Sequence, residues 1–172
     1  DEASDPLSNA TDAISLLSGP EPEQHGHNRR DDEVATVGAW VRARLDEGFR
    51  PEEIAIFART HHILDDRAAA ALSVASASGV KLGDDDERPP QAVVMATMHR
   101  SKGLEFRVVV CMGCEDAQIP PTAVLRDIVD PAERAAAIER ERNVLYVACT
   151  RARERLLVTW TGKVSPLVPG VV

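Results

Sequence analysis

Short apolar runs alternate with longer amphipathic segments over most of this chain. Residues 31–47 place apolar side chains at helical spacing and are followed by Gly48, so we predict a helix there. Residues 54–57 form a short continuous apolar run, which is typical of a strand buried on both faces. A second helix is predicted over residues 63–78, ending at Gly79.

Three more apolar runs predict strands at residues 93–97, 108–112 and 156–160. Between the last two strands, a long helix is expected to start at Asp130 or Pro131, because proline is favoured in the first turn of a helix. Buried strands that alternate with helices predict an α/β fold, with a parallel sheet flanked by helices.

The N-terminal segment has a different composition. Residues 1–30 are rich in Ser, Asn, Gly, Pro and acids, so we expect them to be largely flexible and residues 31–172 to form the folded domain. Residues 1–53 carry 13 acidic and 5 basic residues, whereas residues 54–172 carry 15 of each, so the net charge of −8 lies entirely in the N-terminal third. This acidity argues mildly against binding nucleic acid through overall charge. The missing initiator methionine suggests that Asp1 begins a fragment.

Cysteine content and hydropathy indicate the compartment. Three cysteines are an odd number for a secreted disulfide framework and fit a reducing cytoplasm better. Cys111 and Cys114 have the spacing of a zinc knuckle, but residues three apart on a strand face opposite sides, so we predict buried free thiols and no metal site. No apolar run approaches the roughly 18 residues that span a bilayer, so no membrane contact is expected.

A polar stretch separates two of the predicted strands. Residues 97–106 are Thr-Met-His-Arg-Ser-Lys-Gly-Leu-Glu-Phe and begin at the carboxyl end of a strand, where open α/β sheets bind ligands. They supply a hydroxyl, an imidazole, two cations, a glycine and one carboxylate, a set suited to phosphates on one side and a sugar hydroxyl on the other. An ordinary polar loop explains the same residues about equally well.

Basic residues gather at two further places. Residues 139–142 are well explained as a solvated helix with Glu/Arg pairs. That explanation fits residues 150–153 (Thr-Arg-Ala-Arg) poorly, because little acidic compensation surrounds them, and arginine is suited to binding a charged phosphate. Arg59 and Thr60 follow the strand at residues 54–57, which is a weak signal when taken alone.

Together these segments resemble a known group of motor proteins. Residues 99–106 resemble motif V of UvrD/Rep-type superfamily 1 DNA helicases, residues 145–152 resemble motif VI, and residues 54–60 look like motif IV. Two long matches in the correct order are specific, and the three together span most of the chain, from about Ile54 to Trp160. The resemblance implies the second RecA-like domain of a motor that opens and closes as it moves along single-stranded DNA.

The resemblance also implies roles for residues on the nucleotide side. Arg59 and Arg151 would contact the γ-phosphate of ATP, which is bound with Mg²⁺ mainly by the N-terminal P-loop domain of the same parent protein. Glu105 would hydrogen-bond the ribose.

On the DNA side, Thr97, His99 and Arg100 would lie near the backbone of the single strand. Lys102 and Gly103 would couple the DNA site to the ATP site.

The sequence departs from this family at three points. No G-x-x-x-x-G-K-[ST] occurs, so nothing here can hold phosphates as a P-loop does. Ala58 stands where these helicases often place an aromatic residue that stacks on adenine. The accessory domain that the family inserts between motifs IV and V is reduced to about residues 61–91.

Two hypotheses of different class follow. The first is the C-terminal motor domain of an ATP-dependent DNA helicase or translocase, cytoplasmic and nucleoid-associated, which hydrolyses no ATP by itself. The alternative is a non-enzymatic module that keeps the RecA-like shape to bind a protein or DNA, and the acidic N-terminal third favours it.

Overall fold

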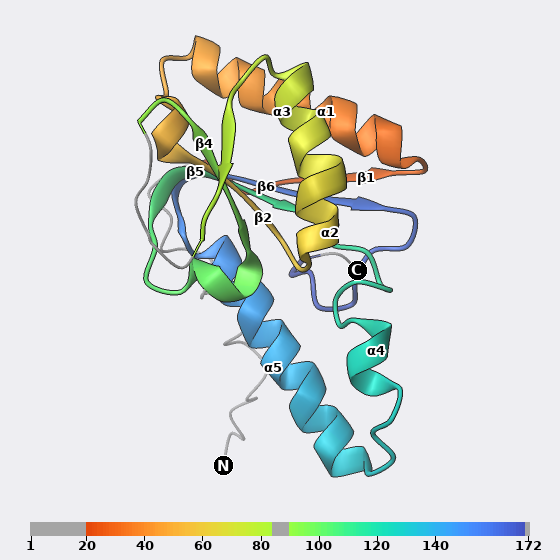
Figure 1. Cartoon of the computed structure of the whole chain (residues 1–172). Helices are drawn as coiled ribbons and strands as arrows, with labels where there is room; N and C mark the ends of the chain where they lie inside the picture. Colours follow the sequence, from red (N-terminus) through yellow and green to blue (C-terminus); the bar gives the residue numbers. More distant parts are fainter. Residues whose placement is uncertain (1–19, 84–89, 171–172) are drawn as a thin grey trace, which may run out of the picture.

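A computed structural model describes residues 20–83 and 90–170 of the protein. Six parallel strands form one sheet in the order β1-β6-β5-β2-β4-β3, with helices on both faces (Figure 1). The α/β fold with a parallel sheet that the sequence predicts is therefore confirmed. The strands are β1 (Glu23–His27), β2 (Ile54–Ala58), β3 (Gly79–Lys81), β4 (Val93–Thr97), β5 (Phe106–Met112) and β6 (Ala152–Thr161).

In the described residues, five α-helices and three shorter turns connect these strands. The helices are α1 (Arg30–Asp46), α2 (His61–Ile63), α3 (Ala69–Val74), α4 (Thr122–Leu125) and α5 (Pro131–Cys149). The turns are the 3-10 turns η3 (Pro51–Glu53) and η5 (Met98–Ser101) and the π-helical turn η4 (Leu64–Ala68).

The middle strands are buried because they are apolar along almost their whole length. Every residue of β2 and β4 is buried, as expected for a parallel sheet covered on both faces. Ala58 at the end of β2 lies opposite Thr97 of β4 on one side and Met112 of β5 on the other. The carboxyl ends of these three strands therefore meet at one edge of the sheet.

Two apolar clusters fill the space on either side of the sheet. Helices α1 and α3, with α2 and η4, cover one face, where Trp40 and Leu72 pack. Helix α5 covers the other face, where Leu145 packs in the same cluster as Phe57 of β2 (Figure 1). The chain therefore leaves β2 toward one face and leaves β5 toward the other.

Helices α1 and α3 approach each other closely at Gly38. A Cβ atom at this position would lie 2.6 Å from Val74 Cβ and 2.7 Å from the carbonyl oxygen of Ala71. No side chain fits in that space, so glycine is what lets the two helices touch.

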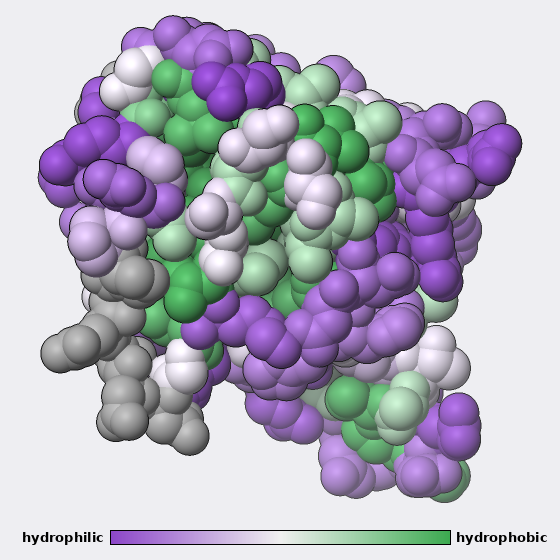
Figure 2. Space-filling view, turned by 45° about the horizontal axis from the view of Figure 1, so that its top comes forward, coloured by the Kyte–Doolittle hydropathy of each residue, from purple (hydrophilic) through white to green (hydrophobic). Residues whose placement is uncertain are grey.

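Figure 2 shows apolar residues in the middle of this side of the molecule and polar residues around them.

Helix α5 extends beyond the sheet that it covers. Asp130 caps its start by accepting a hydrogen bond from the Glu133 N–H at 2.8 Å, and Pro131 follows at the first helical position, as predicted. Its first turns are mostly exposed and protrude beside α4 (Figure 1). Val129, in the loop before α5, is 93% exposed, and a small apolar spot marks the protruding end in Figure 2.

Two sequence predictions were wrong at the sheet edges. Residues 23–27, expected to be flexible, form β1, whose polar sequence Glu-Gln-His-Gly-His gives no strand signal because it is an exposed edge strand. The helix predicted over residues 63–78 ends at Val74, and residues 79–81 form the other edge strand, β3. The rest of the segment predicted to be flexible, residues 1–19, lies outside the described residues.

Residues 61–83 are built into the central domain. Helices α2 and α3 pack on the sheet through the apolar cluster of that face, and β3 pairs with β4. The described part of the segment that we compared with a reduced accessory domain is therefore not set apart from the motor-like fold.

Candidate functional site

The direction of the chain changes where β2 and β5 lie side by side. Beyond β2 the chain turns to α2 and α3 on one face, and beyond β5 it leads to α5 on the other face. In open α/β sheets such a change of direction, at the carboxyl ends of the strands, is where ligands bind. Arg59 is the first residue after β2 and lies at this point.

The side chain of Arg59 turns toward α5 and forms a two-point ion pair with Glu141. Nε donates to Glu141 Oε2 at 2.7 Å, and Nη2 donates to Oε1 at 2.8 Å. The two side chains are 15% and 7% exposed, so little water screens the pair. Among the described residues nothing accepts a hydrogen bond from Nη1, so the outer edge of the guanidinium, Nη1 with the second hydrogen of Nη2, is available.

Glu141 does not lie where its sequence neighbours predict. Residues 139–142 were assigned to a solvated helix face, and Glu139 and Arg142 do form an exposed pair at 3.2 Å. Glu141 is buried instead, one helical turn before the buried Leu145. The helical spacing of Glu141 with the buried Ala137 and Leu145 was the signal that could have revealed this.

Thr97 and His99 lie at the same edge of the sheet. Thr97 is the buried last residue of β4, opposite Ala58. His99 follows in η5, and its pKa lies below the usual 6.5 because partial burial and the positive charge of Arg59 disfavour the protonated ring, while Glu141 offsets part of the effect. His99 is therefore uncharged at neutral pH, and Arg59, Glu141 and His99 form one cluster.

The loop after η5 runs back to the amino end of β5, because β4 and β5 are parallel. Arg100 donates from Nη2 to the carbonyl oxygen of Gly83 at 3.1 Å. Lys102 is exposed, and Gly103 has a φ of +80°, in the left-handed region that favours glycine. Gly103 thus turns the chain toward Glu105.

Arg151 follows α5 and holds this loop in place. Its Nε donates to the Val147 carbonyl at 2.9 Å and its Nη1 to the Leu104 carbonyl at 3.4 Å, while its own carbonyl accepts from the Phe106 N–H at 3.0 Å. Glu105, between Leu104 and Phe106, is exposed and pairs with Arg153 at 3.4 Å. The segments compared with motifs V and VI are therefore in direct contact.

Arg59 and Arg151 contact α5 at different points, and Glu105 pairs with Arg153 of β6, so the three residues are not gathered at one point. Glu141 and Val147, which hold the two guanidinium groups, are six residues apart, or about 9 Å of helix rise. The structure brings Arg59 together with His99, and Arg151 together with the loop that carries Glu105. In the described residues, no hydrogen bond or ion pair joins Arg59 or His99 to Arg151 or Glu105.

A second arginine near the carboxyl edge, which was not predicted from the sequence, is almost completely buried and is held by two carboxylates. Arg67, in η4, donates from Nη1 to Glu33 at 2.8 Å and from Nη2 to Glu115 at 2.6 Å. Glu33 is 0% exposed and also accepts from the Gly113 N–H and from the hydroxyls of Thr159 and Thr161. Although burial lowers the pKa of Arg67, the two carboxylates more than offset this and raise it. The network ties α1, η4, β5 and β6 together.

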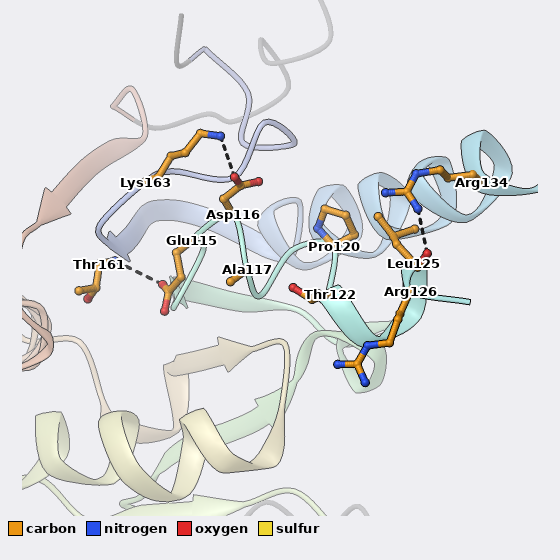
Figure 3. A pocket seen from close by; sticks show the side chains of 10 residues that line it. All are labelled: Glu115, Asp116, Ala117, Pro120, Thr122, Leu125, Arg126, Arg134, Thr161 and Lys163. Atoms are coloured by element: carbon orange, nitrogen blue, oxygen red, sulfur yellow. Dashed lines mark hydrogen bonds and ion pairs between the residues drawn. The ribbon is translucent and has the colours of Figure 1, made fainter. Parts of the chain in front are cut away.

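A cavity of about 740 Å³ opens beyond the carboxyl ends of β5 and β6 (Figure 3). Glu115, Asp116 and Lys163 lie on its strand side, and Arg126 and Arg134 on the side of α4 and α5. Lys163 pairs with Asp116 at 2.8 Å, and Arg134 donates to the carbonyl oxygen of Leu125 at 2.8 Å. None of the site residues predicted from the sequence lines it.

A smaller cavity, of about 370 Å³, lies at the opposite edge of the sheet, and Glu105 and Arg153 line it. Of the predicted site residues, Glu105 lines this cavity, and Arg151, directly before β6, lies at the same amino edge.

The cysteines are free, and Cys111 and Cys114 are buried as predicted. The Sγ atoms of Cys149 and Cys111 are 3.7 Å apart, and this contact together with burial raises the pKa of the Cys111 thiol. In residues 20–83 and 90–170, no cluster of three or more His, Cys, Asp or Glu side chains is arranged to hold a metal ion. No helix in the same residues is long and apolar enough to cross a membrane.

Comparison with known proteins agrees with the resemblance of the motifs. A family model described as the UvrD-like helicase C-terminal domain matches residues 68–163. The ATP-dependent DNA helicase PcrA of Staphylococcus epidermidis is 39% identical over 79 residues, and UvrD1 of Mycobacterium leprae is 38% identical over 81 residues. Each match covers 45% of this chain and 10% of the helicase, so the chain spans about a tenth of the length of these relatives.

A solved structure shares the fold. It is the C-terminal domain of a possible DNA helicase from Lactobacillus plantarum WCFS1, with a TM-score of 0.62 and 21% sequence identity. The match covers 91% of this chain and 86% of the other. Because the family model matches more than half of the sequence, the chain belongs to the UvrD-like helicase C-terminal domain family.

Proposed function

We propose that this domain is the second RecA-like motor domain of an ATP-dependent helicase or translocase that acts on single-stranded DNA. A P-loop domain elsewhere in the parent protein would hold ATP, and this domain would supply arginines to the phosphates and contacts to the DNA backbone. One observation carries the proposal: Arg59 lies where the chain changes direction, with one guanidinium edge held by Glu141 and the other available. The matched relatives are named as ATP-dependent DNA helicases, which supports it.

The residues along α5 fit a nucleoside triphosphate. The outer edge of Arg59 offers two parallel N–H donors, which suit a pair of phosphate oxygens. Arg151 lies just after the C-terminal end of α5 and contacts the Leu104 carbonyl. The next residue, Glu105, carries a carboxylate that can accept hydrogen bonds from ribose hydroxyls. Ala58 is fully buried and has no surface on which adenine can stack, so we assign adenine recognition to the other domain.

The arginines would act on charge that develops during phosphoryl transfer. Negative charge spreads over the transferred phosphoryl oxygens, and a positioned guanidinium stabilises it, an effect worth about 10³–10⁵ in turnover for arginine fingers. Closure of the two domains would bring Arg59 and Arg151 to the phosphates. Mg²⁺ neutralises phosphate charge when bound, and we assign its ligands to the P-loop domain.

The DNA contacts are proposed for the carboxyl edge and the loop that follows it. Thr97 and the uncharged His99 offer hydrogen bonds without a net charge, whereas the exposed Lys102 and the half-buried Arg100 offer positive charge to backbone phosphates. Gly103 joins this loop to Glu105, and the contact of Arg151 with Leu104 links the loop to the nucleotide side.

The proposal is tested by ATP turnover of the full-length parent protein. Arg151→Ala should lower turnover by about 10³ or more while single-strand binding is kept. The 172-residue chain alone should hydrolyse no ATP. Near-normal turnover in the variant would refute the role of Arg151.

A salt titration of single-strand binding tests the DNA side. Affinity should fall with salt, and Lys102→Ala should weaken binding and reduce the salt slope by about one phosphate contact. No binding at low salt by either the chain or the parent protein would favour the non-enzymatic interaction module instead.

A further inference from the structure

The geometry of the Arg59–Glu141 pair selects which part of the guanidinium can meet a ligand. A guanidinium carries five N–H donors in a fixed plane. Glu141 takes the Nε–H and one Nη2–H, with contacts of 2.7 and 2.8 Å, so both carboxylate oxygens are used. Of the three remaining hydrogens, one on Nη1 and one on Nη2 lie parallel along the outer edge, and the second Nη1 hydrogen points back toward Cδ.

We propose that Glu141 is a positioning residue for ATP hydrolysis. Its carboxylate fixes the plane of the Arg59 guanidinium and directs the Nη1–Nη2 edge toward the phosphate held by the other domain. The inference rests on the proposed function. It adds a residue that does not touch the nucleotide but acts through one that does.

The supports of the pair are rigid on both sides. Arg59 follows the fully buried strand β2, and Glu141 lies on the buried stripe of α5 with Leu145. A site whose groups stand on packed strands and helices keeps its geometry better than one on loops. The pair also joins two segments 82 positions apart in the sequence, so it sets α5 relative to the end of β2.

The chemistry favours glutamate over its near relatives. Glutamine has one acceptor oxygen, and its amide hydrogens would face the Arg59 donors, so a two-point pair is lost. Aspartate keeps the charge but is one methylene shorter, so it cannot reach Arg59 from the same backbone position. Both substitutions therefore remove the two-point pair that fixes the orientation of the Arg59 guanidinium, one by changing the acceptor and the other by shortening the side chain.

The experiment measures kcat and KM for ATP in the full-length parent protein. The variants are Glu141→Gln, Glu141→Asp, Arg59→Met and the double variant Arg59→Met/Glu141→Gln. Glu139→Gln is the matched control, because it makes the same change on the exposed face of the same helix. Thermal unfolding of each variant shows whether it is folded at the assay temperature.

We expect Glu141→Gln and Glu141→Asp to lower kcat by about 10²-fold, as a misplaced catalytic group does, with KM changed much less. The double variant should be no slower than Arg59→Met, because the guanidinium that Glu141 positions is already absent. Glu139→Gln should match the wild type. If Glu141→Gln is unfolded, the Glu141→Asp variant and the double variant, which leaves no unpaired charge, decide the question.

Three results separate the possible failures. If Arg59→Met turns over normally, the role of Arg59 in the proposed function is wrong, whatever Glu141 does. If Arg59→Met loses about 10³ but both Glu141 variants keep wild-type kcat, only the positioning role is overturned. If Glu141→Gln slows the Arg59→Met enzyme further, Glu141 acts independently of Arg59, and the inference is equally overturned.

Discussion

Two arginines near the carboxyl edge of the sheet are each held by glutamate, and they differ in which guanidinium N–H donors remain unused. Arg67 uses both terminal nitrogens on Glu33 and Glu115 and is almost completely enclosed. Arg59 uses one edge on Glu141 and keeps the other. The first arrangement joins secondary-structure elements, whereas the second keeps donors ready for a ligand. An arginine is therefore judged by its unused donors and not only by its burial or its partners.

The largest expected effect is on stability, at the enclosed arginine. Arg67→Met leaves Glu33 and Glu115 buried without their cation, which should cost about 3–5 kcal/mol of unfolding free energy. For a chain of this size this corresponds to a melting point lower by roughly 10 °C. Urea and thermal unfolding of the 172-residue chain measure it. Arg42→Met, at an exposed pair with Asp46, is the control and should leave the midpoint unchanged.

Arg59→Met should affect ATP turnover more than stability, whereas Arg67→Met affects mainly stability. Turnover of the parent protein should fall by about 10³, because a guanidinium near the phosphates is lost. Stability should fall by only about 1–3 kcal/mol, because a single carboxylate is left unpaired. The distinction between the two arginines is contradicted if Arg67→Met lowers the unfolding free energy less than Arg59→Met does.

The close approach of α1 and α3 supports the enclosed network, since α1 carries Glu33 and α3 follows the turn that carries Arg67. Gly38→Ala places a Cβ 2.6 Å from Val74 and 2.7 Å from a backbone oxygen, so the helices must separate. We expect a loss of about 1–3 kcal/mol in unfolding free energy. Gly83→Ala is the matched control, because none of the described residues lies within 4 Å of its added Cβ. Equal stability of the two variants would show that the contact is not tight.

The smallest effect concerns His99, which reports on Arg59. Its folded pKa lies below the unfolded value of about 6.5, so the folded state binds the proton less readily than the unfolded state. The stability linked to neutral His99 is therefore fully present above about pH 6.5 and is lost as the pH falls through the folded pKa. Wild type should lose more stability than His99→Gln between pH 7 and pH 5.

An NMR titration of the His99 ring sharpens the comparison of the two arginines. Its pKa should rise in Arg59→Met, because a nearby positive charge is removed, and should stay unchanged in Arg67→Met. A shift of similar size in both variants would contradict the assignment of His99 to the Arg59 cluster alone.

The sequence predicted the parallel α/β fold and the four central strands, because continuous apolar runs such as residues 108–112 have few alternatives. It failed at β1, whose five polar residues are held by pairing with β6 and not by an apolar face. Arg59 was found through its position after a strand and through the resemblance of the motifs. Its partner Glu141, 82 residues away, was not found, because the pairing is set by how α5 packs on the sheet.

The charges of the buried network could not be foreseen either. Glu33 lies in an acidic stretch beside Asp31 and Asp32, and only its helical spacing with the buried Val37 and Val41 separates it from those two residues. Only the fold brings Arg67, Thr159 and Thr161 to it. Long-range polar partners are thus the part of a site that residue patterns leave undetermined.

The two edge strands have a consequence for association between molecules. An open sheet ends in unpaired N–H and C=O groups that can recruit a strand from a neighbouring chain. Here β1 is five residues long and polar, and β3 is three residues long and ends in Lys81. Short edges with polar or charged side chains offer few consecutive hydrogen bonds to an incoming strand. The described sheet is therefore poorly suited to growing by strand addition.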